Sequence, residues 1–316
     1  MIFFRLIRLP NLAIIALTMY LMRLCIMKPL LEFYNFHLQL SNWHFFLLVF
    51  STLMLSAAGY IINDYYDVNT DTVNHPDRVI VGKKISYRLT FNLYLLFNFI
   101  AILIGLYIAS VIHIKLVGLA FLMVSGLLWF YSTNYKSQLI LGNIMVAMFA
   151  GLVPLMVLLF ELPLLNNFYK MQLWGLQINL NYIIWWLACY GIFAFMLTLI
   201  REIIKDTEDF EGDQAYGQQT LPVVSGTLAA KIVIISLLIL TIGFLVYICF
   251  RFLFDPITLV YLISLIISPL LFVIFRIAEA TSKRQYHQAS LICKLVMLSG
   301  ILYAFIAQYI ITYNFK

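Results

Sequence analysis

Nine runs of mostly apolar residues dominate this 316-residue chain and limit what it can fold into. Each run is roughly 20 residues long, which is the length that an α-helix needs to cross the hydrocarbon core of a bilayer. With 64% hydrophobic and only 11% charged residues, the chain is too apolar for a soluble globular domain. The sequence therefore predicts an all-α polytopic membrane protein with nine transmembrane helices. The predicted spans are residues 10–27, 43–62, 89–112, 116–131, 139–160, 182–201, 229–250, 256–276 and 290–313.

The polar stretches between the spans are too short for a separate soluble domain. The two longest are residues 63–88, after the second predicted span, and residues 201–226, after the sixth. We therefore expect residues 1–316 to form one transmembrane domain in which these two stretches are Asp-rich loops.

Span parity and basic residues together predict an orientation. Four spans separate the two Asp-rich stretches, so both emerge on one side of the membrane, together with the N-terminus and the loops after spans four and eight. That side carries 12 basic residues: Arg5, Arg8, Arg78, Lys83, Lys84, Arg88, Lys136, Arg201, Lys205, Arg276, Lys283 and Arg284. The opposite side carries five: Lys28, Lys115, Lys170, Arg251 and Lys316. Because cytoplasmic loops are enriched in Lys and Arg, we expect the N-terminus and the acidic stretches to face the cytoplasm from a cytoplasmic membrane. The same loop residues account for the net charge of +6, which is thus no sign of nucleic-acid binding.

Acidic residues are scarce and concentrated. The chain has 14 of them, and ten lie in residues 64–77 and 202–213. Both segments contain the pattern DxxDxxxD, and each aspartate of the second copy lies 142 residues after its counterpart in the first. The six aspartates are Asp64, Asp67 and Asp71 in the first motif and Asp206, Asp209 and Asp213 in the second.

The spacing of the pattern places its carboxylates on one side of a helix. At 100° per residue, positions 0, 3 and 7 fall within an arc of about 60°, and adding Asn63 widens the arc to about 100°. Two such clusters on one side of the membrane would repel each other unless cations lay between them. Carboxylate oxygens suit Mg²⁺, which completes its octahedron with water and phosphate oxygens, so a polyphosphate is the implied ligand. The competing interpretations are solvated loop acids and structural ion networks with Arg78 and Arg201.

The two aspartate motifs resemble those of the UbiA superfamily of intramembrane prenyltransferases, and the resemblance covers essentially the whole chain. Further similar stretches are Arg8–Asn11, Asn74–Arg78, Tyr131–Ser132 with Lys136, and Gly142–Asn143. Val79 follows Arg78 where many members of the superfamily have proline. Within the superfamily, residues 201–213 and Thr220–Pro222 are most similar to the digeranylgeranylglyceryl phosphate synthases, also called geranylgeranylglyceryl phosphate geranylgeranyltransferases.

This resemblance implies a nine-helix fold in which two Mg²⁺ ions bridge the two motifs to a prenyl diphosphate. It implies that Asn63 and Asp67 hold one ion and that Asp209 and Asp213 hold the other, with Asp71 as a further metal ligand. Asp64 and Asp206 are supporting ligands that we group with the candidate catalytic residues, together with Tyr131 and Ser132. The candidate contacts to the diphosphate are Arg78, Lys136, Lys205 and Asn11.

The expected function is Mg²⁺-dependent transfer of a prenyl group, geranylgeranyl on the closest resemblance, from its diphosphate to a lipophilic acceptor such as a prenylglyceryl phosphate. An aromatic acceptor, as in quinone- or chlorophyll-forming members, remains an alternative. A cation-coupled transporter is the alternative from another class, but transporters place carboxylates near the bilayer midplane rather than at span ends. The expected partners are the diphosphate donor, the acceptor and membrane lipid, with no nucleic acid and no obligate protein partner.

Overall fold

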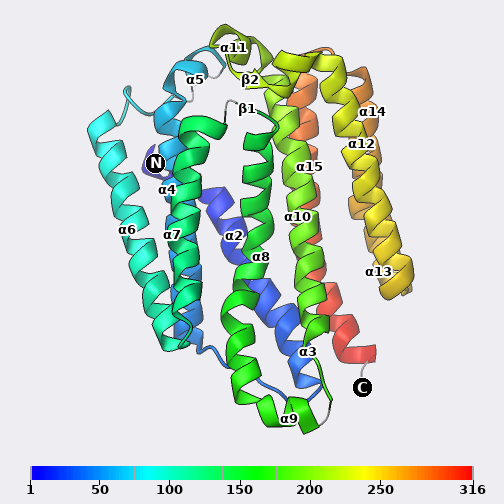
Figure 1. Ribbon diagram of the computed structural model, residues 1–316. Helices are drawn as coiled ribbons and strands as arrows, with labels where there is room; N and C mark the ends of the chain where they lie inside the picture. The colour runs from blue at the N-terminus through cyan, green and yellow to red at the C-terminus, as the bar shows by residue number, and fades with distance from the viewer. Residues whose placement is uncertain (1, 75, 78, 137, 176, 315–316) are drawn as a thin grey trace. The chain divides into compact units, whose positions relative to one another are not determined.

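The fold is described by a computed structural model that covers residues 2–74, 76–77, 79–136, 138–175 and 177–314. It is almost entirely helical (Figure 1). The helices are α1 (Ile2–Leu6), α2 (Leu9–Leu21), α3 (Lys28–Glu32), α4 (Asn42–Tyr66), α5 (Val68–Asn74), α6 (Tyr87–Val111), α7 (Lys115–Phe130), α8 (Leu141–Phe168), α9 (Lys170–Gly175), α10 (Asn181–Glu208), α11 (Phe210–Ala215), α12 (Leu221–Phe252), α13 (Pro256–Tyr261), α14 (Ser268–Glu279) and α15 (Lys283–Asn314). Three π-helical segments, Met22–Met27, Tyr131–Tyr135 and Leu262–Ile267, continue α2, α7 and α13. The strands β1 (Gln138–Leu139) and β2 (Gln219–Thr220) pair in parallel.

Within the residues that the structure describes, nine helical segments are long and apolar enough to cross a membrane, which confirms the predicted number of spans. They are Leu9–Glu32, Asn42–Tyr66, Tyr87–Val111, Lys115–Tyr135, Leu141–Phe168, Asn181–Glu208, Leu221–Phe252, Pro256–Glu279 and Lys283–Tyr313. Large apolar side chains are exposed along these helices, such as Leu95, Phe99 and Leu103 of α6. Such surfaces suit lipid rather than water, so the chain is an integral membrane protein.

Several helices are longer than their apolar runs predicted. The sixth span was predicted to end at residue 201, but α10 continues to Glu208. The apolar run ends where charges begin, yet Glu202 and Lys205 favour a helix and form an ion pair three residues apart. As a result, the stretches predicted as Asp-rich loops, 63–88 and 201–226, are partly helical and include α5 and α11.

The chain divides into two compact units, comprising residues 1–136 with 153–185, and residues 137–152 with 186–316. In the first unit α4 packs along α6, and α7 packs against both helices (Figure 1). Its core includes Ala57, Ala58, Ile61 and Ile62 of α4, all fully buried. Ser41 and Ser86 begin α4 and α6 by accepting hydrogen bonds from backbone amides three residues ahead, which satisfies otherwise unpaired donors.

The second unit is built around α10, α12, α14 and α15. Helix α14 packs against both α12 and α15. The buried core takes side chains from all four helices, among them Ile200, Ile203, Ile204, Ile234, Leu238, Val273, Ile277, Ala289 and Cys293. Each unit contains one of the two aspartate motifs, and the expectation of a single domain stays a prediction.

Candidate active site

The first aspartate motif lies at the junction of α4 and α5. Asp64 belongs to the last turn of α4, Asp67 follows the helix, and Asp71 belongs to α5. The backbone amide of Asp67 donates to the carbonyl of Asn63 at 3.0 Å, and that of Asp71 donates to the carbonyl of Asp67 at 2.8 Å. Asp67 itself keeps a right-handed conformation, with φ −85° and ψ −2°. Helical hydrogen bonding therefore continues across the junction and keeps the three carboxylates on one side of the helical segment.

The second motif repeats this local structure in the other unit. Asp206 lies in the last turn of α10, Asp209 follows the helix, and Asp213 belongs to α11. The amide of Asp209 donates to the carbonyl of Lys205 at 2.8 Å, and that of Asp213 donates to the carbonyl of Asp209 at 3.1 Å. Asp209 has φ −95° and ψ 12°, close to the values at Asp67. The two motifs thus share a backbone conformation as well as a spacing.

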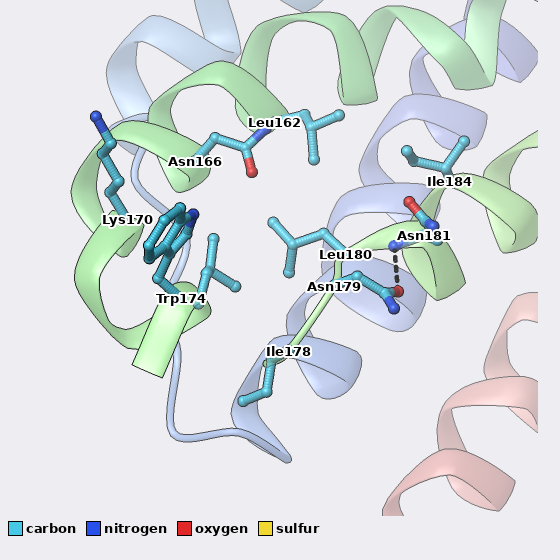
Figure 2. Close-up of a pocket in the computed structure, with 10 residues that line it drawn as sticks. Leu162, Asn166, Lys170, Trp174, Ile178, Asn179, Leu180, Asn181 and Ile184 are labelled. Carbon is cyan, nitrogen blue, oxygen red and sulfur yellow. Dashed lines mark hydrogen bonds between the residues drawn. The ribbon is translucent and has the colours of Figure 1, made fainter. Parts of the chain in front are cut away.

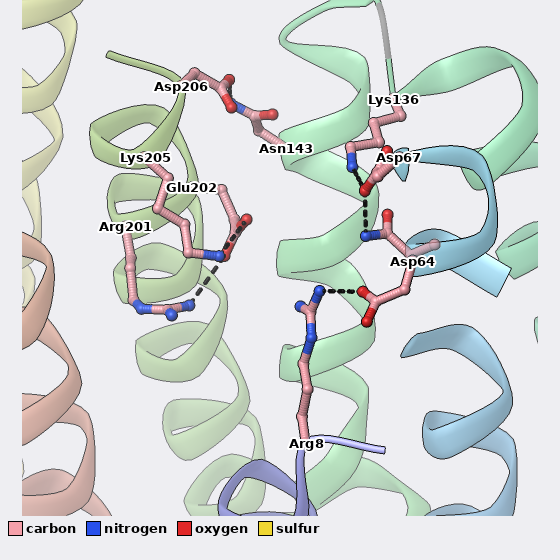
Figure 3. Close-up of polar contacts among 10 residues, drawn as sticks. Arg8, Asp64, Asp67, Lys136, Asn143, Arg201, Glu202, Lys205 and Asp206 are labelled. Atoms are coloured by element: carbon pink, nitrogen blue, oxygen red, sulfur yellow. Dashed lines mark hydrogen bonds and ion pairs between the residues drawn. The ribbon is translucent and has the colours of Figure 1, made fainter. Parts of the chain in front are cut away.

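Basic and amide side chains hold the carboxylates of the first motif (Figure 3). Arg8 Nη2 donates to Asp64 Oδ1 at 2.8 Å, and the Arg8 guanidinium lies 5.0 Å from the centre of the Tyr60 ring. Lys136 Nζ donates to Asp67 Oδ2, and Asn63 Nδ2 donates to the same oxygen at 2.6 Å. Among the described residues, two cations therefore lie beside the three aspartates of the first motif.

Burial and these ion pairs shift the pKa values of groups around the first motif. Burial alone would lower the pKa of Lys136, but the Asp67 carboxylate and Tyr131 outweigh it and raise this pKa above its usual value. Arg8 behaves alike, since Asp64 outweighs burial and the pKa of Arg8 is raised. Burial, followed by the charge of Asp67, raises the pKa of Asp71 to about 6. Both cations are thus firmly charged, whereas the Asp71 carboxylate lacks solvation.

The partners described for the second motif are of different kinds and belong to its own unit. Asn143 Nδ2 donates to Asp206 Oδ2 at 2.7 Å (Figure 3). Lys283 Nζ lies 3.8 Å from Asp209 Oδ1, and Thr220 Oγ1 donates to Asp213 Oδ2 at 3.2 Å. Thr220 belongs to β2, whose pairing with β1 brings the start of α8, and with it Asn143, into this region.

Two of the predicted catalytic residues, Tyr131 and Ser132, lie on the π-helical segment that continues α7. Tyr131 and Ser132 begin the π-helical turn that precedes Lys136, where the Lys136 amide donates to the Tyr131 carbonyl at 2.9 Å. The Ser132 hydroxyl donates to the Leu128 carbonyl of its own helix at 3.0 Å.

Three predicted contacts to the diphosphate have different outcomes. Lys205 Nζ contacts Glu202 Oε1 at 3.0 Å. Asn11 is half-buried in the first turn of α2, three residues after Arg8. Arg78 lies outside the described residues.

The donor groups of both motifs are of the kind that Mg²⁺ prefers. Asn63 Oδ1 is buried and has no hydrogen-bond partner among the described residues, so it is placed to accept a cation. No three His, Cys, Asp or Glu side chains within the described part of the chain are already gathered at metal-binding distances. The residues fit Mg²⁺ by chemical type, and in the first motif Lys136 provides the positive charge beside Asp67.

Sequence reasoning missed four partners of the aspartates. Arg8 and Asn143 lie in stretches that support the family resemblance, so their motifs were a signal for them. Thr220 begins the Thr220–Pro222 stretch of the same resemblance, whereas Lys283 carries no such signal, because the chain brings it to Asp209 only through its fold. A cavity of about 360 Å³ in the first unit, between the end of α8, α9 and the start of α10, contains none of the predicted site residues (Figure 2).

Comparisons with known proteins identify the family and the fold. Residues 33–298 match the UbiA prenyltransferase family. The chain is 29% identical to the digeranylgeranylglyceryl phosphate synthase of Methanosphaera stadtmanae over 81% of this chain and 85% of that protein. A solved structure of a digeranylgeranylglyceryl phosphate synthase shares its fold with a TM-score of 0.60, at 20% identity, covering 96% of this chain and 98% of that one. A UbiA homologue from Archaeoglobus fulgidus, bound to GPP and Mg²⁺, has a TM-score of 0.56 at 19% identity, covering 96% and 99% of the two chains.

Proposed function

Because this chain belongs to the UbiA prenyltransferase family, we propose that it transfers a geranylgeranyl group from its diphosphate to a prenylglyceryl phosphate, with Mg²⁺ as cofactor. The observation that carries the proposal is the repeated junction, in which each motif holds three aspartates on a continuous helical turn. The name shared by several relatives, digeranylgeranylglyceryl phosphate synthase, supports this donor and acceptor. The alternative is transfer of the prenyl group to an aromatic acceptor.

In this proposal each motif provides ligands for one Mg²⁺ ion. Asn63, Asp67 and Asp71 would hold one ion, while Asp209 and Asp213 would hold the other. When bound, Mg²⁺ offsets the negative charge of the diphosphate and makes it a better leaving group. We expect both motifs to be required, because each would hold only one of the two ions that offset the charge of the diphosphate.

The surrounding side chains then have distinct tasks. Arg8 and Asn143 keep the carboxylates of Asp64 and Asp206 in place through the hydrogen bonds described above. The ammonium group of Lys136 leaves Asp67 and contacts an oxygen of the diphosphate. Asn11 and Arg78 are the other proposed contacts to the donor. Lys205 stays a predicted diphosphate contact, now with Glu202 as its partner in the structure. Tyr131 and Ser132 stay candidates on resemblance.

The reaction is an exchange of one bond for another at the first carbon of the prenyl chain. The acceptor hydroxyl oxygen forms a bond to this carbon, the bond from the carbon to the diphosphate oxygen breaks, and the hydroxyl proton is released. Electrostatic stabilisation of the departing diphosphate is the main contribution that the site offers. The positive-inside pattern supports placing this chemistry on the cytoplasmic side.

Two aspartate variants test the proposal. We expect Asp67→Ala and Asp209→Ala each to abolish the transfer of labelled geranylgeranyl from its diphosphate, and EDTA to abolish the wild-type activity. Glu32→Ala and Glu279→Ala are matched controls, since each removes an exposed carboxylate from one unit and should retain activity. Full activity in both aspartate variants would contradict the mechanism. Assays with prenylglyceryl phosphate and with aromatic acceptors decide the acceptor class.

A further inference from the structure

The cavity of about 360 Å³ in the first unit lies where α8 ends and α10 begins, with the short helix α9 beside it (Figure 2). Its volume is within the roughly 300–1,000 Å³ of pockets that hold small ligands. None of the described residues that line it belongs to the candidate active site. Its own lining therefore determines what it can bind.

The exposed side of the cavity is polar and positively charged. Lys170 provides an ammonium group, and Asn166, Asn179 and Asn181 provide amides, and all four residues are exposed. Asn166 lies across the cavity from Asn179 and Asn181 (Figure 2), and Asn179 Oδ1 accepts a hydrogen bond from the backbone amide of Asn181 at 3.2 Å. No carboxylate is among the described residues that line the cavity, so Lys170 gives the lining a net positive charge.

The inner side of the cavity is apolar. Leu162, Leu180 and Ile184 line it, and Leu180 is buried while the other two are half-buried. Pockets of this kind bind ligands through apolar contacts and orient them through a few polar groups. An ammonium and amides in front of an apolar wall suit a ligand that is anionic at one end and apolar at the other.

Exposed apolar side chains place the cavity at the surface of the membrane. Met171 and Trp174 of α9 are 82% and 86% exposed, and Phe168, the last residue of α8, is 65% exposed. Aromatic side chains such as Trp are enriched at the boundary between lipid headgroups and hydrocarbon. Helix α8 is about 42 Å long at 1.5 Å per residue, comparable with the roughly 40–45 Å of a bilayer with its headgroups. Lys170, two residues beyond this helix, is therefore at the depth of the headgroups.

The acidic side chains at this end of the first unit have other partners. The described residues include two, Glu32 and Glu161. Glu32 Oε1 lies 3.7 Å from Lys28 Nζ, and Glu161 Oε1 accepts a hydrogen bond from the backbone amide of Leu40 at 3.0 Å. Neither of them lines the cavity, so an anionic ligand would meet the charge of Lys170 without a carboxylate beside it.

We propose that this cavity binds an anionic phospholipid from the leaflet opposite the first aspartate motif. The motif follows the second span and the cavity follows the fifth, so three spans separate them and they lie on opposite sides of the membrane. Lys170 contacts the lipid phosphate, and the asparagine amides bind its remaining oxygens and the hydroxyls of the headgroup. The apolar wall packs against the glycerol backbone and the start of the lipid tails. Basic pockets between membrane-spanning helices bind anionic headgroups in other proteins.

Lipid binding to the purified full-length protein tests this site. Native mass spectrometry counts the lipids that the protein retains in detergent during titration with phosphatidylglycerol, or with phosphatidylcholine of the same acyl chains. We expect one phosphatidylglycerol to bind more tightly than the others, and Lys170→Gln to weaken its binding about 5-fold, the effect of one lysine at a membrane surface. Lys170→Arg should bind like wild type. Lys28→Gln, which removes an exposed cation from the same end of the first unit outside the cavity, is the matched control and should leave this binding unchanged.

A second pair of variants tests the cavity without changing its charge. Asn166 and Asn167 are neighbouring exposed residues at the end of α8, but only Asn166 lines the cavity. We expect Asn166→Leu to weaken phosphatidylglycerol binding about 2- to 10-fold, the contribution of one neutral hydrogen bond, and Asn167→Leu to bind like wild type.

Several outcomes would overturn the lipid site. Equal affinity of the wild type for the two lipids would do so, as would unchanged phosphatidylglycerol binding in Lys170→Gln. Equal weakening in Lys170→Gln and Lys28→Gln would reduce the effect to general surface charge, and equal weakening in the two asparagine variants would remove the cavity from the explanation. Displacement of the bound phosphatidylglycerol by an equal concentration of inorganic phosphate would assign the cavity to a free anion instead.

Discussion

Lys136 is linked both to the first aspartate motif and to the diphosphate that this motif is expected to bind. Its ammonium contacts Asp67, a predicted metal ligand, and is itself a predicted contact to the diphosphate. If Lys136 competes with Mg²⁺ for Asp67 in the free enzyme, it weakens the binding of Mg²⁺. If it then contacts the diphosphate, it strengthens the binding of the prenyl diphosphate. This makes the role of Lys136 separable by kinetics.

We predict that Lys136→Met raises the KM for the prenyl diphosphate about 10-fold or more, since a hydrogen bond to a charged group contributes roughly 1.5–3 kcal/mol. The same change should lower the Mg²⁺ concentration needed for half-maximal activity, because no ammonium competes for Asp67. Initial rates at varied donor and Mg²⁺ measure both effects. Lys115→Met, at the other end of α7, is the matched control. An increase in the Mg²⁺ requirement would contradict this role.

We propose that Arg8 acts on the reaction through Asp64. Its 2.8 Å contact fixes a carboxylate whose neighbours in sequence are predicted metal ligands. Partners that orient metal-site residues typically contribute 10- to 100-fold in activity. We predict that Arg8→Gln lowers kcat/KM by about 10- to 100-fold and weakens Mg²⁺ binding measured by calorimetry, while Arg5→Gln has no effect. Wild-type Mg²⁺ affinity in Arg8→Gln would show that the ion pair is merely structural.

At the scale of elements, the junctions after α4 and α10 share one design. In each, a long helix ends, one aspartate follows it, and a short helix of six or seven residues carries the next aspartate. Hydrogen bonds across the junction preserve the helical register, so the spacing of the carboxylates survives the break. This explains how aspartates beyond the end of a span remain on the same side as those within it.

Helix packing in the first unit depends on a small residue. A Cβ on Gly105 of α6 would overlap the ring of Phe121 of α7, so these helices can approach closely only with glycine there. We predict that Gly105→Ala lowers the free energy of unfolding by about 1–3 kcal/mol through overpacking, and with it the temperature of unfolding. Thermal unfolding of the purified protein in detergent measures the change.

Two further variants make this packing prediction specific. Gly126 of α7 has open space where a Cβ would be, so Gly126→Ala should be neutral or slightly stabilising. Adding Phe121→Leu to Gly105→Ala should recover part of the lost stability, because the smaller side chain leaves room for the new methyl group. A Gly105→Ala protein as stable as wild type would contradict close packing between α6 and α7.

At the scale of the whole molecule, the orientation in the membrane is the open prediction. Residues 84 and 167 are exposed at opposite ends of helices of the first unit, and an odd number of spans separates them. We predict that Lys84→Cys reacts with a membrane-impermeant thiol reagent only in inside-out vesicles, and Asn167→Cys only in right-side-out vesicles. Background labelling should be low, since three of the four native cysteines are buried and Cys189 is half-buried. The reverse pattern would place the aspartate motifs outside the cytoplasm.

Local sequence was enough to predict the spans and the motifs. A run of about 20 apolar residues has few alternatives in a bilayer, because its backbone must form hydrogen bonds within the helix. The spacing of Asp64, Asp67 and Asp71 likewise fixes their relative direction wherever the chain is helical. The helix ends were predicted less well, since α4 and α10 continue into polar residues that hydropathy alone assigns to loops.

Hydropathy was sufficient to predict the number of spans, and residue spacing was sufficient to identify the two aspartate motifs. Which side chains hold those aspartates depends on the fold. Arg8 and Asp64 are 56 residues apart, Lys136 and Asp67 are 69 apart, and Asn143 and Asp206 are 63 apart. Contacts over such separations depend on which helices pack together, and no local periodicity encodes that choice.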